Sequence, residues 1–413
     1  MNTNNRIRSA VFLCLMASAL SANASEQRAP KPTMEQATSS ADVSASQLQA
    51  LLAALPQLEF GNKGDVTPSG LSRLYGVTAR ALKQHASAEQ AQALFKLYER
   101  DAKQGNLTAL WSMAKCFEVG VGVKKDVAAA LDRYRQAADK GDTDAQNQLG
   151  YFYHNGIGVK QDFGRAVYWY QQAAQQGEAV AQYNLAWRYV LGEGVVKDAA
   201  LGATWFDKAA QQGFADAQFQ LGFSYLNGRG VKQDDATAIS WLRKAVAQHL
   251  AEAQNQLGEL IRDGRAGLKA SDAEALPLFK EAAEKNAAAA FNLGVMLEAG
   301  RATAKNIPEA IHWYNRAADY GNASAQLRMG ELYGEGKVLP KAPEETARFY
   351  GYAAKQGNAE GQYRFAQLLL SGQGIAKNPG EAKDWLVKAA GQNHARAKEL
   401  IASGLDAKSS GLR

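Results

Sequence analysis

Residues 145–174 read AQNQLGYFYHNGIGVKQDFGRAVYWYQQAA, and this stretch decides the fold because its pattern returns every 36 residues. Apolar residues around Leu149 recur at helical spacing, and Gly156 ends this first helix because glycine enters the left-handed backbone region at little cost. Asp162 then caps a second helix by accepting backbone N–H bonds, and the apolar stripe of that helix leads to the pair Ala173–Ala174. The stretch therefore predicts a pair of helices as the repeating unit.

The 36-residue period holds along most of the chain. Steps of 36 residues from Leu149 meet an apolar residue, here called the core residue, each time: Met113, Leu149, Leu185, Leu221, Leu257, Leu293, Met329 and Phe365. A glycine lies seven positions after each core residue: Gly120, Gly156, Gly192, Gly228, Gly264, Gly300, Gly336 and Gly372. A period of roughly 20–50 residues is typical of a solenoid, whose units stack because none can bury its apolar face alone. We therefore predict an all-α solenoid with eight units over residues 105–392, and we expect its function to lie on an extended surface.

The first 24 residues have the pattern of a signal peptide. Arg6 and Arg8 precede an apolar run over residues 10–20, and residues 22–24 form a small-residue cleavage site. No later stretch approaches the ~18 uninterrupted apolar residues that a membrane-spanning helix needs. We therefore expect export, cleavage after Ala24 and a soluble product in the periplasm.

Charge and cysteine content narrow the classes of partner. The formal net charge of +6 falls to +4 after cleavage, because residues 1–24 hold two arginines and no acidic residue. Lysine and arginine are interleaved with aspartate and glutamate, and the sequence has no clustered basic stripe. It therefore does not predict a nucleic-acid partner. Cleavage also removes Cys14, so Cys116 cannot form an intramolecular disulfide, and we expect it to be a buried small hydrophobe.

The segments outside the regular units are less patterned. Residues 25–70 predict a disordered leader, a short amphipathic helix with leucines over 48–55, and a linker. That helix docks on the body or stays mobile, and one hypothesis is that it lies in the protein's own groove as a plug. Residues 71–104 resemble a degenerate helix pair, and residues 393–413 predict a capping helix and a tail.

Two departures from ideal helical pairs carry structural predictions. Gly150 lies inside the first helix of its unit, where glycine costs about 1 kcal/mol against alanine, and it recurs at 222, 258, 294 and 330. We infer that a neighbouring helix approaches closely there. In the fifth unit His249 and Lys285 replace the closing glycine, and the alanine pair Ala282–Ala283 lies one residue later than in the other units. This shift indicates an insertion before the second helix and a deletion after it. We predict that residues 262–288 are the least protected part of the solenoid.

The repeating unit also follows a recognisable pattern, A-x-x-x-L-G-x-x-Y-x-x-G-x-G-V-x-x-D-x-x-x-A-x-x-W-[YF]-x-x-A-A, which in the third unit runs from Ala181 to Ala210. It closely resembles the Sel1-like repeat, a relative of the tetratricopeptide repeat, and covers about 70% of the chain. The resemblance implies a right-handed superhelix of paired antiparallel helices whose concave face binds other proteins or peptides. It also implies a bacterial member that is exported and works in the cell envelope.

The resemblance places the first helix of each unit on the concave side, so candidate binding residues lie on that helix away from its core stripe. Two residues before the core residue stand Trp111, Asn147, Tyr183, Phe219, Asn255, Phe291, Leu327 and Tyr363. Two residues after it stand Lys115, Tyr151, Trp187, Phe223, Glu259, Val295, Glu331 and Gln367. The family pattern requires neither column for the core, yet six of the eight positions in the first four units hold aromatic residues. The candidate partner-binding residues are Trp111, Tyr151, Tyr183, Trp187, Phe219 and Phe223.

Two interpretations of these aromatic residues remain open. They form a groove that anchors a partner protein, or neighbouring A helices bury the rings against one another. In the first case Trp187→Ala or Tyr183→Ala weakens partner binding and leaves the thermal midpoint nearly unchanged. In the second case both substitutions lower stability.

Motifs for catalysis are weak or missing from the sequence. No HExxH, GxSxG, P-loop or dinucleotide fingerprint is present, and the histidines are too scattered for metal-ligand spacing. Residues 112–115 match the SxxK motif of penicillin-recognising enzymes, but Met113 occupies the core position and no SDN or KTG partner follows. We therefore expect no catalysis, no metal and no cofactor.

The sequence favours an exported, non-catalytic scaffold or adaptor of the cell envelope that binds a partner protein in a concave groove. The alternative is an immunity protein that neutralises a periplasmic toxin effector such as a phospholipase. A β-lactamase-like enzyme or cell-wall hydrolase is a third class, and its turnover would disappear with Ser112→Ala. The partner and the oligomeric state stay open.

Overall fold

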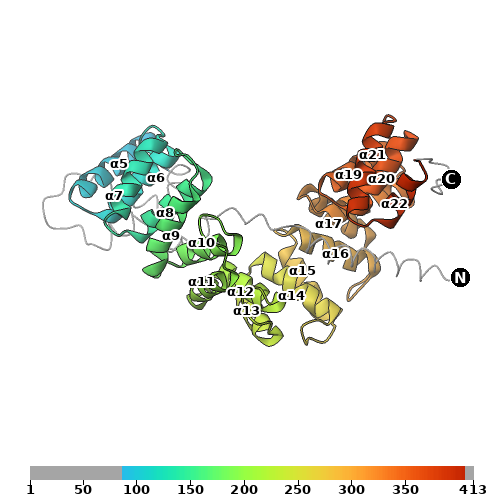
Figure 1. Cartoon of the computed structure of the whole chain (residues 1–413), viewed down its shortest axis with the longest axis horizontal. Helices are drawn as coiled ribbons and strands as arrows, with labels where there is room; N and C mark the ends of the chain where they lie inside the picture. The colour runs from blue at the N-terminus through green and yellow to red at the C-terminus, as the bar shows by residue number, and fades with distance from the viewer. Residues whose placement is uncertain (1–85, 405–413) are drawn as a thin grey trace. The chain divides into compact units, whose positions relative to one another are not determined.

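The computed structural model describes residues 86–404, and this part of the chain consists of eighteen helices without a strand (Figure 1). The predicted signal peptide, leader, short amphipathic helix and linker lie outside the described residues, as do residues 71–85 of the predicted degenerate helix pair and the tail after 404. The described helices form two compact units, the N-terminal unit from α5 to α12 (residues 86–234) and the C-terminal unit from α13 to α22 (residues 235–404).

The helices alternate between two kinds, as the 36-residue period predicts. The first helix of each pair, here called the A helix, is α6 (Leu107–Val119), α8 (Thr143–Asn155), α10 (Ala179–Leu191), α12 (Ala215–Asn227), α14 (Ala251–Asp263), α16 (Ala287–Ala299), α18 (Ala323–Glu335), α20 (Ala359–Ser371) and α22 (Ala395–Ala402). The second, or B helix, is α5 (Ala88–Lys103), α7 (Val127–Ala138), α9 (Phe163–Gln175), α11 (Ala199–Gln211), α13 (Asp235–Ala247), α15 (Asp272–Ala282), α17 (Ile307–Asp319), α19 (Pro343–Lys355) and α21 (Pro379–Gly391). Within each unit a helix contacts the helices before and after it in sequence, which makes an α/α solenoid.

The predicted caps and stops bound these helices. The Oδ1 atoms of Asp126, Asp162 and Asp198 accept hydrogen bonds from the backbone N–H three residues later, at 3.0, 2.9 and 2.9 Å. Asn306 and Asn378 do the same for α17 and α21. The eight predicted glycines end their A helices in the left-handed region, with φ between 63° and 79°. Local sequence therefore sets both ends of most pairs.

The glycine inside the A helix makes room for an aromatic ring. A Cβ atom at Gly150 would lie 2.6 Å from the Tyr170 ring of the paired B helix. The same holds in other repeats, where a Cβ atom would lie 2.5–2.8 Å from the ring: Gly258 with Phe279, Gly294 with Tyr314 and Gly330 with Tyr350. The predicted close approach is confirmed at these four positions. The group that approaches the glycine is an aromatic side chain of the paired B helix.

The fifth repeat is irregular in a slightly different way from the prediction. Eight positions separate Gly264 from the start of α15, and seven separate Gly300 from the start of α17, so the expected insertion is present. The compensation lies inside the helix, because α15 has 11 residues and α17 has 13. The connection after α15 is not shortened.

Candidate functional site

The structure buries two of the six predicted binding residues. Tyr183 and Trp187 on α10 are each only 4% exposed. Tyr183 packs against Phe206 of the paired α11 and Phe214 before α12, with ring centroids 5.6 and 5.2 Å apart, and Trp187 lies 5.5 Å from Phe206. Both rings are buried, as in the second interpretation, but Phe206 of a B helix and Phe214 cover them, and not the rings of neighbouring A helices.

The column two residues before the core residue faces the interior more than the sequence indicates. Six of its eight members are buried: Asn147, Tyr183, Asn255, Phe291, Leu327 and Tyr363. The expectation that the core does not need this column is therefore wrong. The reason is that each A helix is covered both by its own B helix and by the following repeat. The column two residues after the core residue is half-buried in six of eight repeats.

Four of the predicted residues, Trp111, Tyr151, Phe219 and Phe223, are half-buried on A helices of the N-terminal unit. We call them the aromatic surface. Trp111 of α6 and Tyr151 of α8 flank the same hydrophobic cluster. Phe219 and Phe223 lie one turn apart on α12, with ring centroids 6.4 Å apart, and the Arg229 guanidinium lies 5.1 Å from the Phe223 centroid. The structure thus groups the four residues as two pairs.

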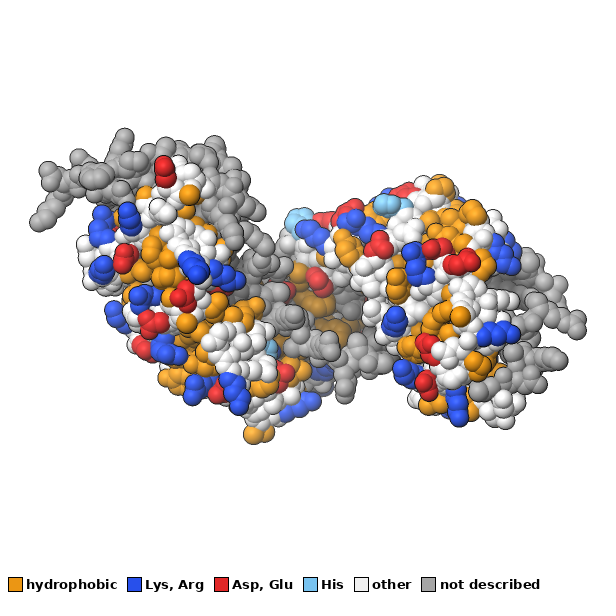
Figure 2. Space-filling view, turned by 90° about the horizontal axis from the view of Figure 1, so that it is seen from above, with side chains coloured by type: hydrophobic (Ala, Val, Ile, Leu, Met, Phe, Trp, Pro, Cys, Tyr) orange, Lys and Arg blue, Asp and Glu red, His pale blue; other side chains and the backbone are white. Residues whose placement is uncertain are grey.

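Charges of both signs surround such apolar areas. On the face shown in Figure 2, basic and acidic side chains are interspersed and hydrophobic side chains form patches between them. Next to Trp111, the Lys115 ammonium lies 5.6 Å from the ring centroid and forms an ion pair with Glu118 at 3.1 Å. The aromatic surface therefore combines apolar area with fixed charge at its edge.

A buried glutamine ladder, which the sequence argument missed, joins consecutive repeats. The buried Gln146 donates to the carbonyl of Ala138 at 3.1 Å and accepts from Gln176 at 2.9 Å. The contact with the preceding B helix recurs in other repeats, at Gln182, Gln218, Gln326 and Gln362. The recurring Ala-Gln dipeptide at 145–146 and its equivalents is the signal that would have predicted this ladder.

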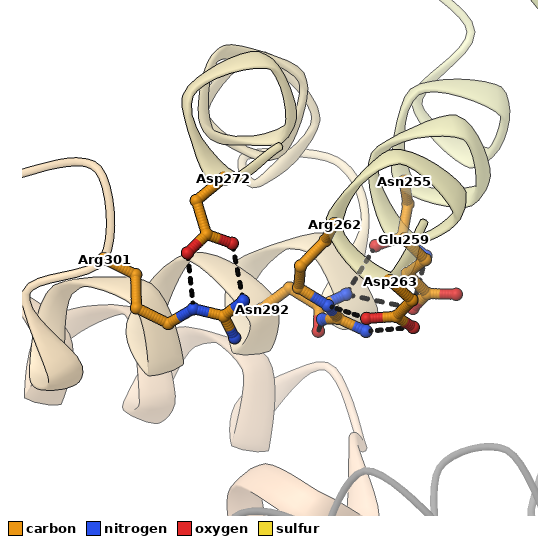
Figure 3. A network of polar contacts seen from close by, with 7 residues as sticks. All are labelled: Asn255, Glu259, Arg262, Asp263, Asp272, Asn292 and Arg301. Carbon is orange, nitrogen blue, oxygen red and sulfur yellow. Dashed lines mark hydrogen bonds and ion pairs between the residues drawn. The ribbon is translucent and has the colours of Figure 1, made fainter. Parts of the chain in front are cut away.

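Buried asparagine pairs link neighbouring A helices in both units. Asn184 donates to Asn147 at 3.0 Å in the N-terminal unit, and Asn292 donates to Asn255 at 2.9 Å in the C-terminal unit. Figure 3 shows the second pair, where Arg262 donates to Asn292 Oδ1 at 2.8 Å. These contacts satisfy amides that would be costly to bury unpaired.

Figure 3 also shows that a salt bridge ties the irregular α15 to the next repeat. Arg301, which follows α16, contacts both carboxylate oxygens of Asp272 at 2.8 and 2.5 Å. A bidentate arginine–carboxylate pair is among the stronger ionic contacts in proteins. The first turn of α15 is therefore held by the following repeat.

One arginine of α10 is buried within a polar cluster. Arg188 is 1% exposed, lies 2.5 Å from Glu193 and contacts the His154 ring of α8. Burial, together with the charge of Arg188, lowers the pKa of His154 to about 4. His154 is therefore uncharged at neutral pH, where it contacts the buried cation Arg188, and we assign this contact a structural role.

The residues of the SxxK match are engaged in the fold. Ser112 is buried and its hydroxyl donates to the Thr108 carbonyl at 2.8 Å. Lys115 bonds to Glu118 and Gln148. Cys116 is buried, as predicted, and burial raises the pKa of its thiol to about 12. The Ser112 hydroxyl and the Lys115 ammonium thus both make hydrogen bonds within the fold.

Residues 86–404 hold no group of three histidine, cysteine, aspartate or glutamate side chains that could bind a metal ion. In the same range, no helix combines the length and the apolar character that crossing a membrane requires.

Comparison with known proteins decides the family. The Sel1 repeat model matches eight consecutive segments, which together span residues 107–394. The chain belongs to the Sel1 repeat family. Sel1 repeat proteins are in general non-catalytic scaffolds, and this chain is a Sel1 repeat scaffold for protein interaction. None of the curated proteins is significantly similar in sequence to it.

Solved Sel1 repeat structures are similar to this chain. A protective antigen of uropathogenic Escherichia coli is 28% identical with a TM-score of 0.57, covering 86% of this chain and 83% of its own. A Sel1 repeat protein from Oxalobacter formigenes is 33% identical with a TM-score of 0.53, covering 55% of this chain and 93% of its own. An immunity protein from Pseudomonas aeruginosa is 22% identical and covers 54% of this chain and 86% of its own. Its TM-score of 0.36 is too low to relate its function to this chain.

Proposed function

We propose that this Sel1 repeat protein is an exported, non-catalytic scaffold or adaptor of the cell envelope that binds a partner protein through its aromatic surface. The observation that carries the proposal is the half-burial of Trp111, Tyr151, Phe219 and Phe223 on A helices of one unit. Partly exposed aromatic rings anchor protein interfaces because they bury a large area at a low cost in side-chain entropy. Export follows from the signal-peptide pattern of residues 1–24.

The repeats themselves argue that the fold does not require these rings. In the fifth repeat Asn255 and Glu259 stand at the positions of Phe219 and Phe223. Because the repeats share one helical pair, aromatic residues at these positions in the fourth repeat serve something other than the common fold. A partner-binding role accounts for both their residue type and their exposure.

The experiment is affinity purification of the tagged protein from its native periplasm, followed by mass spectrometry. The double variant Phe219→Asn and Phe223→Glu gives the fourth repeat the residues of the fifth. The control is Tyr168→Ala, which removes a 54% exposed aromatic ring from a B helix of the same unit. We expect the partner proteins to be lost with the double variant and kept with the control. Equal recovery with both would contradict the proposal.

The stoichiometry of what is recovered tests the scaffold role. A scaffold retains several envelope proteins at moderate affinity. A single toxic partner retained at 1:1 would replace the scaffold with the immunity-protein function, for which no feature of the described residues argues specifically.

A further inference from the structure

A pocket of about 420 Å³ lies in the N-terminal unit where α7, α8 and the start of α9 meet. Its lining includes Arg135 of α7, the buried Tyr153 of α8, Lys160 in the connection, and Asp162 and Arg165 at the start of α9. It is on different elements from the SxxK residues, and it shares none of the four residues of the aromatic surface.

The tyrosine positions two of the cations. Arg135 Nη2 donates to the Tyr153 hydroxyl oxygen at 3.2 Å. The Arg165 guanidinium lies 5.5 Å from the centroid of the same ring, within the range of a cation–π contact. Two guanidinium groups are thus placed around one rigid, buried ring.

Positive charge exceeds negative charge in this pocket. Three cations face one carboxylate, Asp162, which already accepts from the backbone N–H of Arg165 at 2.9 Å as the α9 cap. Its other oxygen lies 3.4 Å from Arg165 Nε. Across residues 86–404, neither Arg135 nor Lys160 takes part in an ion pair.

Other repeats show that the fold does not require this charge. At the next junction along the chain the same three positions hold Gln171, Val196 and Leu201. At the preceding junction they hold Glu99, Lys124 and Ala129. The three cations therefore come together at a single one of these three junctions, although the helical pair is the same.

Helix electrostatics makes Arg165 more unusual still. Arg165 is the third residue of α9, and the positive end of the helix dipole disfavours a cation there. The third residue is a glutamate in four other B helices, at Glu274, Glu309, Glu345 and Glu381. The Asp162 carboxylate offsets part of this repulsion, and an external anion bound by Arg165 would offset more of it.

We propose that this pocket binds an acidic segment of a partner protein, with an aspartate or glutamate carboxylate held between Arg135 and Arg165 and Lys160 adding positive charge. The planar guanidinium group matches a carboxylate through two parallel hydrogen bonds. The pocket is open and far larger than the roughly 30 Å³ that one water occupies, so it admits a side chain with its neighbouring backbone. The inference rests on the proposed function, because it names the chemistry of the partner.

The test titrates the full mature chain into fluorescein-labelled hexaglutamate at low ionic strength and follows fluorescence anisotropy. Arg165→Glu installs the residue found in α17, and Arg135→Gln installs the residue of the next junction, Gln171, so both variants are expected to fold. Each is expected to weaken hexaglutamate binding about tenfold or more, as loss of a charge-assisted hydrogen bond does. The matched control is Arg243→Gln, at the same helix position as Arg135 three repeats later, which is expected to leave affinity unchanged.

Two results would overturn the proposal. Equal affinity of Arg135→Gln and Arg243→Gln for hexaglutamate would show that binding depends only on net charge, because each variant removes one positive charge. Binding of inorganic phosphate without binding of hexaglutamate would show a small-ion site. The double variant Phe219→Asn and Phe223→Glu is expected to keep hexaglutamate binding, so a failure of the pocket is distinguished from a failure of the aromatic surface.

Discussion

The ring of Tyr170 occupies the space that a side chain at Gly150 would need, because a Cβ atom there would lie 2.6 Å from the ring. This relationship between the two helices of a repeat explains why a glycine lies inside a helix, where it costs about 1 kcal/mol. The close approach of the B helix offsets that local cost. Packing within the pair therefore outweighs helix propensity at this position.

We expect Gly150→Ala to lower the free energy of unfolding by about 1 kcal/mol. Overpacking typically costs about 1–3 kcal/mol, which exceeds the gain in helix propensity of about 1 kcal/mol. The first repeat has Ala114 beside Tyr134, so the ring can be accommodated and the net cost is expected to be modest. Urea unfolding measures the change.

The control for this substitution is Gly391→Ala at the end of α21, where an added Cβ would meet no atom within 4 Å. It is expected to be neutral or stabilising. A gain in stability from Gly150→Ala would show that the ring moves aside without cost.

We expect Trp187→Ala and Tyr183→Ala to destabilise the protein by about 3 kcal/mol each, because both rings are buried between helices. This replaces the expectation that their loss leaves the thermal midpoint unchanged. Phe223→Ala, at a half-buried ring, is expected to cost about 1 kcal/mol or less. Comparable unfolding curves for Trp187→Ala and Phe223→Ala would contradict the burial argument.

The pH dependence of stability in the C-terminal unit is expected to involve Glu360. Burial raises the pKa of Glu360, but bonds from His394 and Arg364 outweigh it and bring the pKa to about 2, below its ordinary value of 4.5. Because the folded pKa is lower than the unfolded one, the stabilisation is complete above about pH 4.5 and is lost as the pH falls towards 2.

Glu360→Gln removes this contribution. The variant is expected to be less stable than the natural chain by roughly 1–3 kcal/mol at pH 7, with the difference shrinking below pH 4. Urea unfolding at several pH values measures this, and Glu252→Gln at an exposed position of α14 serves as control. A difference that stays constant from pH 7 to pH 2.5 would exclude the ionised carboxylate as its cause.

Hydrogen exchange is expected to be fastest, among the helices of the repeats, over residues 262–288. The B helix of this repeat, α15, is two residues shorter than α17, and the connection before it is longer. Arg301→Ala removes the salt bridge to Asp272 and is expected to speed exchange in α15 further. Exchange as slow over 262–288 as over 141–248 would refute the prediction.

The 36-residue period was sufficient to predict the helical pairs, the aspartate caps and the glycine stops, because all of these depend on residues close together in sequence. It did not predict that Tyr183 and Trp187 are buried. Phe206 and Phe214, which cover Tyr183, lie 23 and 31 residues further along the chain. Whether a column of equivalent residues is buried depends on how successive repeats stack. The residue types in one column do not contain that information.

The basic pocket was missed for a related reason. Arg135 and Arg165 lie on different helices and come together only when α9 packs beside α7 and α8. Comparison of equivalent positions in successive repeats would have found the pocket, because Arg135 and Arg165 stand where the next repeat has Gln171 and Leu201. The glutamine ladder was visible in the sequence in the same way.

The central claim is that the aromatic surface binds a partner protein. The most direct test is the equilibrium affinity of a partner recovered from the periplasm for the purified natural chain and for the variant carrying Phe219→Asn and Phe223→Glu. We expect the variant to bind at least tenfold more weakly, with its free energy of unfolding lowered by roughly 2 kcal/mol at most, and Tyr168→Ala to bind like the natural chain. Unchanged affinity of the folded double variant would contradict the claim.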